Sequence, residues 1–292
     1  MQGIAARTGR SLIVFTWDGG SLDHISLDAE PQFDILLFDF TGRATRPDRD
    51  WPFLSQKTEC KGDVLRVVSR YLRQDGRHPE YVALFDHDIK ACIGGINRVL
   101  EIARREKLDS FAPALSHDSY FSYPRFLEKP HSTVRKTKWV EVMMPFYRTE
   151  LFLAADDFYE RSITAYGIDS FVMPMFQKLL GMENVAIIDL VTVTHMHPVS
   201  SGSRCCSNGL TPYRERVLAR QHCLAWIRTH NPELIGTPWY YDTFAPFDGP
   251  ARFWLLRLLW PLHKVRRFWE SLPSLRRRTA KRTSLPRALP PA

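Results

Sequence analysis

Two aspartates, Asp86 and Asp88, stand one residue apart at the end of the apolar run Tyr81–Ile89. In an extended strand, side chains two positions apart lie on the same side of the pleat, so both carboxylates can face one hard cation. Burying two like charges without a counter-ion costs free energy or raises one pKa, and Mg²⁺ or Mn²⁺ with oxygen ligands removes that problem. The spacing therefore predicts a divalent-metal site that faces a diphosphate. A solvated turn at the strand end is the alternative.

A histidine follows a second apolar run. His195 comes directly after Val185–Thr194, so its imidazole can complete a metal site begun by the two aspartates. His197 lies on the same side of the chain if the strand continues. We favour His195 as the ligand, with His197 and a purely structural histidine as the alternatives.

The elements that must position these residues alternate between strands and helices. Apolar runs and helical spacing predict them at these ranges: strands at 12–15, 33–39, 81–88, 139–145 and 185–194, helices at 63–74, 93–106, 148–162 and 168–180, and a short apolar segment at 111–115. Alternation of this kind predicts one α/β domain with an open, mostly parallel sheet and helices on both faces. Ligands of such sheets bind outside the carboxyl ends of the strands, where Asp39, Asp86, Asp88 and His195 are expected.

The order of motifs resembles the GT-A-type nucleotide-sugar glycosyltransferases. FDHD at 85–88, an aromatic loop at 116–138, YGID at 166–169 and VTVTHMHP at 191–198 carry the resemblance, which covers 12–199. Within that group the chain is most similar to an uncharacterised glycosyltransferase-like family with a DxD-type element, a Gly-hydrophobic-Asp element and a C-terminal histidine. YGID lacks the doubled acid of the commonest base motif in such enzymes.

The resemblance implies a metal-dependent transferase that uses Mn²⁺ or Mg²⁺ on Asp86, Asp88 and His195. Departure of a nucleoside diphosphate places negative charge on the leaving phosphate, which a metal ion offsets. The attacking acceptor hydroxyl must lose a proton to a base, and Asp169 is the expected base. Gly167 would let the backbone approach the donor closely. A helix cap before 170–180 is the alternative role of Asp169.

Further residues are expected to bind the two substrates. The expected donor-binding residues are Asp39, Lys57, Lys61 and His87. The expected acceptor-binding residues are Glu141, Tyr120 and Arg125, with Arg135, Phe121 and Tyr123 as part of the same platform. Turn caps, solvated loops, edge-strand ion pairs and ordinary core aromatics are the alternatives.

The chain's net charge of +8 is unevenly distributed. Residues 251–292 hold eleven Lys or Arg and the single acid Glu270, a net of +10, which leaves −2 for residues 1–250. Apolar residues from Trp254 to Trp269 recur every three or four positions, which predicts a basic amphipathic helix suited to an anionic membrane surface. We therefore expect a GT-A-like domain at 1–250 and a membrane-binding segment at 251–292. Packing of this helix on the domain is the alternative.

Location and chemistry class follow from what the sequence lacks. It shows no signal peptide and no uncharged stretch of about 20 residues, so we expect a cytoplasmic protein at the inner membrane face. Five cysteines without regular spacing argue against a disulfide framework and structural zinc. No nucleic-acid module is recognisable, so nucleic acid is not an expected partner.

The expected function is transfer of a sugar to a glycan or lipid-linked acceptor in polysaccharide biosynthesis. A catalytically silent binding or scaffold protein is the alternative.

Overall fold

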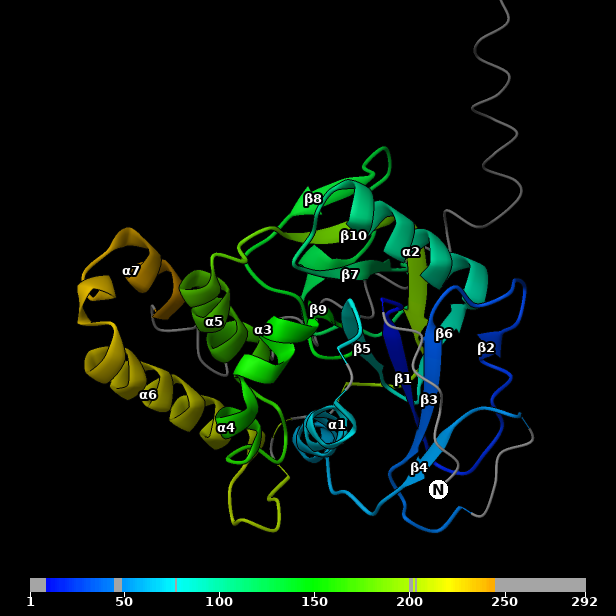
Figure 1. Ribbon diagram of the computed structural model, residues 1–292, viewed down its shortest axis with the longest axis horizontal. Helices are drawn as coiled ribbons and strands as arrows, with labels where there is room; N and C mark the ends of the chain where they lie inside the picture. Colours follow the sequence, from blue (N-terminus) through cyan, green and yellow to red (C-terminus); the bar gives the residue numbers. More distant parts are fainter. Residues whose placement is uncertain (1–8, 45–48, 77, 200–201, 203, 245–292) are drawn as a thin grey trace, which may run out of the picture. The chain divides into compact units, whose positions relative to one another are not determined.

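The computed structural model describes residues 9–44, 49–76, 78–199, 202 and 204–244. Its strands are β1 (Leu12–Trp17), β2 (Ile25–Ser26), β3 (Asp34–Asp39), β4 (Phe53–Ser55), β5 (Tyr81–Phe85), β6 (Ile89–Cys92), β7 (Ser110–Leu115), β8 (Val134–Lys136), β9 (Phe146–Arg148) and β10 (Val185–His195). Its helices are α1 (Lys61–Asp75), α2 (Ile93–Arg105), α3 (Thr149–Ala154), α4 (Asp156–Tyr159), α5 (Met173–Leu180), α6 (Pro212–His230) and α7 (Pro238–Phe244). Shorter helical turns are η1 (Pro124–Phe126), the π-helical η2 (Ile168–Val172) and η3 (Pro232–Leu234). Figure 1 shows their arrangement.

The strands form one sheet in the order β2-β6-β10-β7-β9-β5-β1-β3-β4, with β8 paired to β10. Strands β1, β3, β4 and β5 are mutually parallel. Strand β9 runs antiparallel to both β5 and β7, and β7 is parallel to β10. These pairings make β5, β7 and β10 point the same way, so the residues that follow them meet at one edge. The predicted fold class, a mostly parallel sheet flanked by helices, is confirmed.

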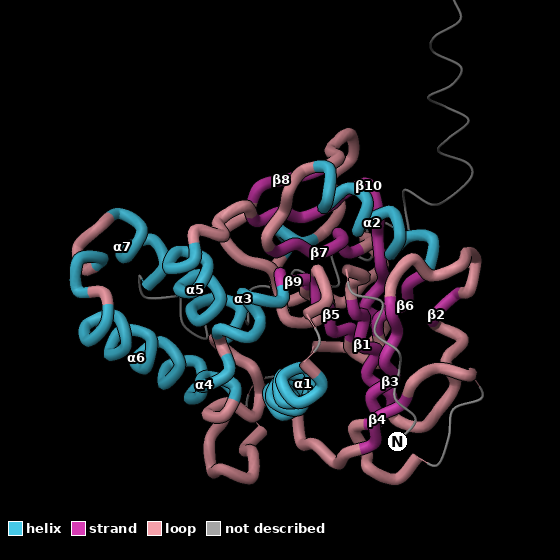
Figure 2. Tube along the Cα trace, viewed as in Figure 1, coloured by secondary structure: helices cyan, strands magenta, loops and turns pink. Residues whose placement is uncertain are grey.

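Alternate residues of the strands supply two cores, one on each face of the sheet. In β1, Ile13 and Phe15 belong to the core that α2 covers, whereas Leu12 and Val14 belong to the core on the other face. Helices α1, α3, α5 and α6 cover this second face. Figure 2 shows α5, α6 and α7 gathered beside one end of the sheet. Burial on both faces explains why these strands are continuous apolar runs.

The predicted strand at 139–145 is wrong. Residues 142–144 form a turn, and the antiparallel β9 begins only at Phe146. The segment joins β5 through its carbonyl groups, because Asp86 N donates to Met143 O at 2.9 Å and Leu84 N donates to Pro145 O at 3.3 Å. Pro145 has no N–H to add to such a ladder. The alternating pattern of buried residues therefore arises here without a strand.

Two other predicted elements differ in detail. The predicted helix at 148–162 is two short helices, α3 and α4, which meet at Ala155, where the backbone leaves helical geometry at φ −89° and ψ 5°. Strand β5 ends at Phe85, earlier than predicted. A turn follows in which Ile89 N donates to Asp86 O at 3.0 Å.

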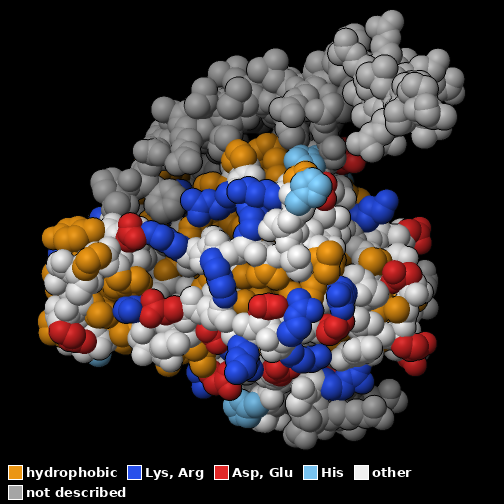
Figure 3. Space-filling model, turned by 90° about the horizontal axis from the view of Figure 1, so that it is seen from above, with side chains coloured by type: hydrophobic (Ala, Val, Ile, Leu, Met, Phe, Trp, Pro, Cys, Tyr) orange, Lys and Arg blue, Asp and Glu red, His pale blue; other side chains and the backbone are white. Residues whose placement is uncertain are grey.

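The basic segment at 251–292 lies outside the described residues. Within the described parts of the chain, no helix has the length and apolar character needed to cross a bilayer. Basic and acidic side chains are interspersed on the face of the molecule seen in Figure 3. That mixture agrees with the near-neutral charge of residues 1–250.

Candidate active site

Asp86 begins the turn after β5 and forms an ion pair with Lys61. The Lys61 ammonium lies 2.6 Å from Asp86 Oδ1 and donates to the Leu84 carbonyl at 3.0 Å. Lys61 opens α1, and only 9% of its side chain is exposed. Burial raises the pKa of Asp86, and the Lys61 charge opposes that rise. The lysine expected at the donor thus neutralises one of the two paired aspartates.

Asp88 faces two histidines of the segment that ends β10. His195 Nε2 lies 3.1 Å and His197 Nδ1 lies 3.6 Å from the same oxygen, Asp88 Oδ2. Burial raises the pKa of Asp88, but the hydrogen bond and charge of His195 outweigh it and leave the pKa low. Burial lowers the pKa of His195, but the hydrogen bond and charge of Asp88 outweigh burial. The pKa of His195 is therefore above its ordinary value. The structure therefore brings Asp88 and both candidate histidines together.

The orientation of His195 is fixed by the loop after β7. Its Nδ1 lies 3.0 Å from the Tyr120 carbonyl, which can only accept, so Nδ1 carries the hydrogen. The backbones pair as well, because Tyr120 N donates to His195 O at 3.0 Å and His195 N donates to Ser119 Oγ at 3.1 Å. Nε2 is consequently held toward Asp88. Tyr120 contributes to the site through its backbone.

Asp169 lies in η2, and its side chain is buried. Gly167 precedes this turn at φ 94°, and a Cβ there would lie 2.9 Å from Ala219 Cβ of α6. Both the backbone conformation and the packing therefore require glycine. Burial raises the pKa of Asp169 to about 6, although the nearby Arg216 charge lowers it. A carboxylate with this pKa is mostly ionised at pH 7 and can accept a proton.

Glu141 lies in the loop between β8 and β9, and the charges of the other site residues act on its carboxyl group. It is 6% exposed, and burial raises its pKa to about 8. Its charged neighbours are Asp169, His195 and Asp86. Glu141 therefore lies within electrostatic range of residues from three other segments of the chain.

The other residues expected to bind the donor have local partners or are exposed. The buried Asp39 accepts hydrogen bonds from Thr41 N and Oγ1, Ala44 N and Ser55 Oγ, at 2.6–2.9 Å. Burial raises its pKa, but these bonds outweigh burial and lower it to about 2. Asp39 thus organises the turn after β3. Lys57 is exposed, and the His87 ring packs at 5.2 Å from Phe40.

The expected acceptor platform is only partly assembled. Arg125 is exposed and stacks over the Trp139 ring at 5.3 Å, beside Tyr123. Arg135 instead forms a two-point ion pair with the buried Asp189, with Nε–Oδ2 at 2.6 Å and Nη2–Oδ1 at 2.9 Å. It also donates to the carbonyls of Arg125 and Leu127. The Arg135 guanidinium therefore holds the aromatic loop in place.

Comparisons with known proteins give structural similarities alone. No protein-family model matches the chain, and no curated protein matches it. Similar solved structures include S. aureus TarS in complex with UDP-GlcNAc, at 13% identity and a TM-score of 0.43, over 81% of this chain and 78% of that one. They also include GalNAc-T7 with UDP, GalNAc and Mn²⁺, at 10% identity and a TM-score of 0.46, over 90% of this chain and 57% of that one. The STIV protein A197 is similar at 12% identity and a TM-score of 0.36, over 70% of this chain and 91% of that one. Similarities this distant assign no activity to this chain.

Asp88 and His195 are the side chains that bear on the expected divalent-metal site. In the described ranges, no three His, Cys, Asp or Glu side chains form a metal-holding group. Asp88 and His195 nevertheless fit such an ion, because the Nδ1 bond to a backbone carbonyl is the second bond that metal-binding histidines make. Mg²⁺ is commonly held by one or two carboxylates together with substrate phosphates and water. Two protein ligands are therefore a sufficient donor set.

Two residues of α6, the half-buried Arg216 and the buried Glu215, lie near Asp169 and its loop, and the sequence does not predict them. Arg216 neighbours Asp169 and lies 5.6 Å from the centre of the Phe171 ring. Glu215 accepts hydrogen bonds from Thr164 N and Oγ1, Ile163 N, Ser162 Oγ and Asn208 Nδ2, at 2.6–3.2 Å. These bonds fasten the loop before Gly167 to α6. The contacts of Glu215 with residues 162–164 span 51–53 residues, so no local spacing signals them.

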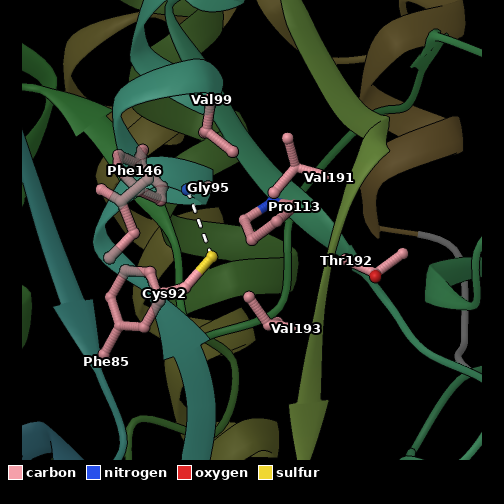
Figure 4. A pocket seen from close by; sticks show the side chains of 10 residues that line it. Phe85, Cys92, Gly95, Val99, Pro113, Phe146, Val191, Thr192 and Val193 are labelled. Carbon is pink, nitrogen blue, oxygen red and sulfur yellow. Dashed lines mark hydrogen bonds between the residues drawn. The ribbon is translucent and has the colours of Figure 1, made fainter. Parts of the chain in front are cut away.

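An apolar pocket lies between α2 and the sheet. Figure 4 shows its lining, in which Gly95 N donates to Cys92 Sγ at 3.3 Å. Its lining residues are Phe85, Cys92, Gly95, Ile96, Val99, Pro113, Phe146, Val191, Thr192 and Val193. No charged side chain is among them, so this pocket is unsuited to a diphosphate.

Proposed function

We propose that the protein is a metal-dependent glycosyltransferase that moves a sugar from a nucleotide-sugar donor to a glycan or lipid-linked acceptor. The observation that carries the proposal is the meeting of Asp88 with His195, 3.1 Å apart, beside the carboxyl ends of β5 and β10. The buried Glu141 carboxyl lies within electrostatic range of both His195 and Asp169. This edge of a parallel sheet is where ligands of open α/β folds bind. A site with one oriented imidazole and several buried carboxyl groups suits a metal-bound diphosphate and a proton acceptor.

Asp88 and His195 would hold Mn²⁺ or Mg²⁺, with Asp86 beside them. When bound, such an ion supplies Lewis-acid stabilisation of the negative charge on a departing diphosphate. Lys61 keeps the Asp86 carboxylate neutralised at 2.6 Å. The Tyr120 carbonyl keeps the His195 ring in place. These residues orient the donor's leaving group.

Asp169 would act as the general base. The acceptor hydroxyl oxygen forms a bond to the anomeric carbon, the bond from that carbon to the diphosphate oxygen breaks, and the hydroxyl proton passes to Asp169. A pKa of about 6 leaves the carboxylate available at pH 7 while keeping it basic enough to take the proton. The Arg216 charge lowers this pKa and so favours the ionised form.

The acceptor and its location complete the proposal. Arg125 is exposed and lies over the buried Trp139 ring, beside the half-buried Tyr123, so it would offer an acceptor a cation at the edge of an aromatic cluster. The basic segment at 251–292 would hold the enzyme on the cytoplasmic face of an anionic membrane, where acceptors for surface polysaccharide are assembled.

A thermal-shift screen tests the donor side of the proposal. The full-length protein is heated with UDP-, GDP- and CMP-sugars, each with and without Mn²⁺. A ligand that binds only the native state raises the melting temperature. We expect one nucleotide class to stabilise the protein and to do so only with the metal. Absence of any metal-dependent shift across the panel would refute the proposed donor site.

A further inference from the structure

The side chain of Glu141 is buried with one carboxyl oxygen unsatisfied. It is 6% exposed, Ser122 hydrogen-bonds the carboxyl group, and Oε2 has no hydrogen-bond partner in the described structure. A buried polar atom without a partner costs stability, and an apolar side chain of similar size would avoid that cost. Glu141 therefore stabilises the fold less than such a residue would. An unsatisfied buried group calls for an explanation, and a functional role is one of them.

The position of Glu141 limits which ligand group can reach it. Its loop is joined to the metal side of the site, because Asp86 N donates to Met143 O at 2.9 Å. The Glu141 carboxyl also lies within electrostatic range of Asp169 and His195. In a nucleotide-sugar complex, the anomeric carbon of the sugar is bonded to the diphosphate. The acceptor hydroxyl that attacks this carbon is activated by the general base, so the transferred sugar ring lies between the diphosphate and the base.

We infer that Glu141 binds a hydroxyl group of the sugar ring that is transferred, and so contributes to recognition of the donor sugar. The inference rests on the proposed function and assigns Glu141 to the donor, whereas the sequence placed it at the acceptor. A carboxyl group can accept from a hydroxyl or, when protonated, donate to it. Either bond would satisfy Oε2, and a nucleoside diphosphate without a sugar could not make it.

The test compares Glu141→Met with Glu141→Gln in the full-length protein. Methionine fills a similar volume without hydrogen bonding, and glutamine keeps both a donor and an acceptor. Calorimetry with Mn²⁺ measures binding of UDP, of GDP and of the nucleotide-sugar that binds wild type most tightly. We expect Glu141→Met to bind the free diphosphate as wild type does and the nucleotide-sugar about tenfold or more weakly. Glu141→Gln should retain most of the affinity for the nucleotide-sugar.

The outcomes separate this inference from the proposed function. Unchanged nucleotide-sugar affinity in Glu141→Met would overturn the inference alone, and a raised acceptor KM in the same variant would return Glu141 to the acceptor. Equal losses for free diphosphate and nucleotide-sugar would also overturn it. If wild type binds no nucleotide with Mn²⁺, both the inference and the proposed function fail. A melting temperature at or above that of wild type is expected for Glu141→Met, because the unsatisfied oxygen is gone.

Discussion

Nε2 of His195 lies 3.1 Å from Oδ2 of Asp88, while Nδ1 of the same ring is held by the Tyr120 carbonyl at 3.0 Å. One ring nitrogen is thus committed to the backbone, and the other is directed at a carboxylate from a different strand end. This arrangement fixes the imidazole in the orientation that a metal ion bound to both Asp88 and His195 requires.

Replacement of Asp88 tests that arrangement. Asp88→Ala should abolish Mn²⁺-dependent binding of the nucleotide donor while the far-ultraviolet circular dichroism spectrum stays unchanged, because the bond from Met196 N to Asp88 O at 2.9 Å, which ties this turn to the end of β10, uses the backbone carbonyl and not the side chain. Asp118→Ala, which removes an exposed aspartate of the 116–120 loop, is the matched control and should bind normally. Asp86→Ala should also abolish binding, and it leaves Lys61 without its ion-pair partner. Full metal-dependent binding in both active-site variants would exclude the site.

Asp169 gives a prediction about rate and pH. Asp169→Asn keeps shape but cannot accept a proton, so transfer should fall roughly 10²–10⁴-fold while donor binding persists. In wild type, kcat should decline as the pH falls through about 6, since protonation removes the base. The measurement is the pH profile of product formation. A near wild-type rate in Asp169→Asn would leave this residue a structural role only.

Glu141 gives a prediction about stability. Its pKa is about 8 in the folded protein against an ordinary value of 4.5. Between these values the folded state keeps a proton that the unfolded state has lost, so the free energy of unfolding falls as the pH rises, by up to about 1.4 kcal/mol per pH unit. Glu141→Met lacks this dependence, and its advantage over wild type should grow from pH 5 to pH 8.

Urea denaturation with EDTA present measures this difference. Glu101→Met is the matched control for the exchange of glutamate for methionine, because the Glu101 side chain is 59% exposed. A constant difference in unfolding free energy between Glu141→Met and wild type across this pH range would show that Glu141 ionises normally in the folded state.

The sequence predicts the long buried strands β1, β3, β5 and β10 and the edge at which Asp88 and His195 meet, but not the short strands β2, β4, β6, β8 and β9. Runs such as Tyr81–Phe85 are buried on both faces, so their apolar continuity signals them directly. The segment at 139–145 shows a similar pattern for another reason, since it packs beside β5 through carbonyl bonds and then turns. Local pattern cannot distinguish these two cases.

Partners of the site residues are less predictable, because they come from distant segments. Lys61 was expected to meet a nucleotide, but it pairs with Asp86, 25 residues away. Arg135 was expected in the acceptor platform, but Asp189 holds it from 54 residues away. Charge and spacing identify residues able to do chemistry, whereas the sheet order decides which of them meet.

The basic segment at 251–292 gives a prediction about location. Full-length protein should bind vesicles that contain anionic lipid, and binding should weaken as salt rises, because charges are screened over about 8 Å at physiological ionic strength. Replacing Arg276, Arg277 and Arg278 with glutamine should weaken binding further at low salt. Vesicle co-sedimentation measures both effects. Equal binding to neutral and anionic vesicles would contradict the membrane proposal.

Turnover of a nucleotide-sugar tests the central proposal most directly. Full-length wild type, Asp88→Ala and Asp169→Asn are incubated with the donor selected by thermal shift, Mn²⁺ and a membrane extract as acceptor, and both diphosphate release and sugar incorporation are measured. We expect wild type to release nucleoside diphosphate and incorporate sugar in equal amounts, to stop when EDTA is added, and to exceed both variants by roughly 10²-fold or more. Metal-dependent donor binding without any turnover in wild type would contradict the enzyme and identify a silent binding protein.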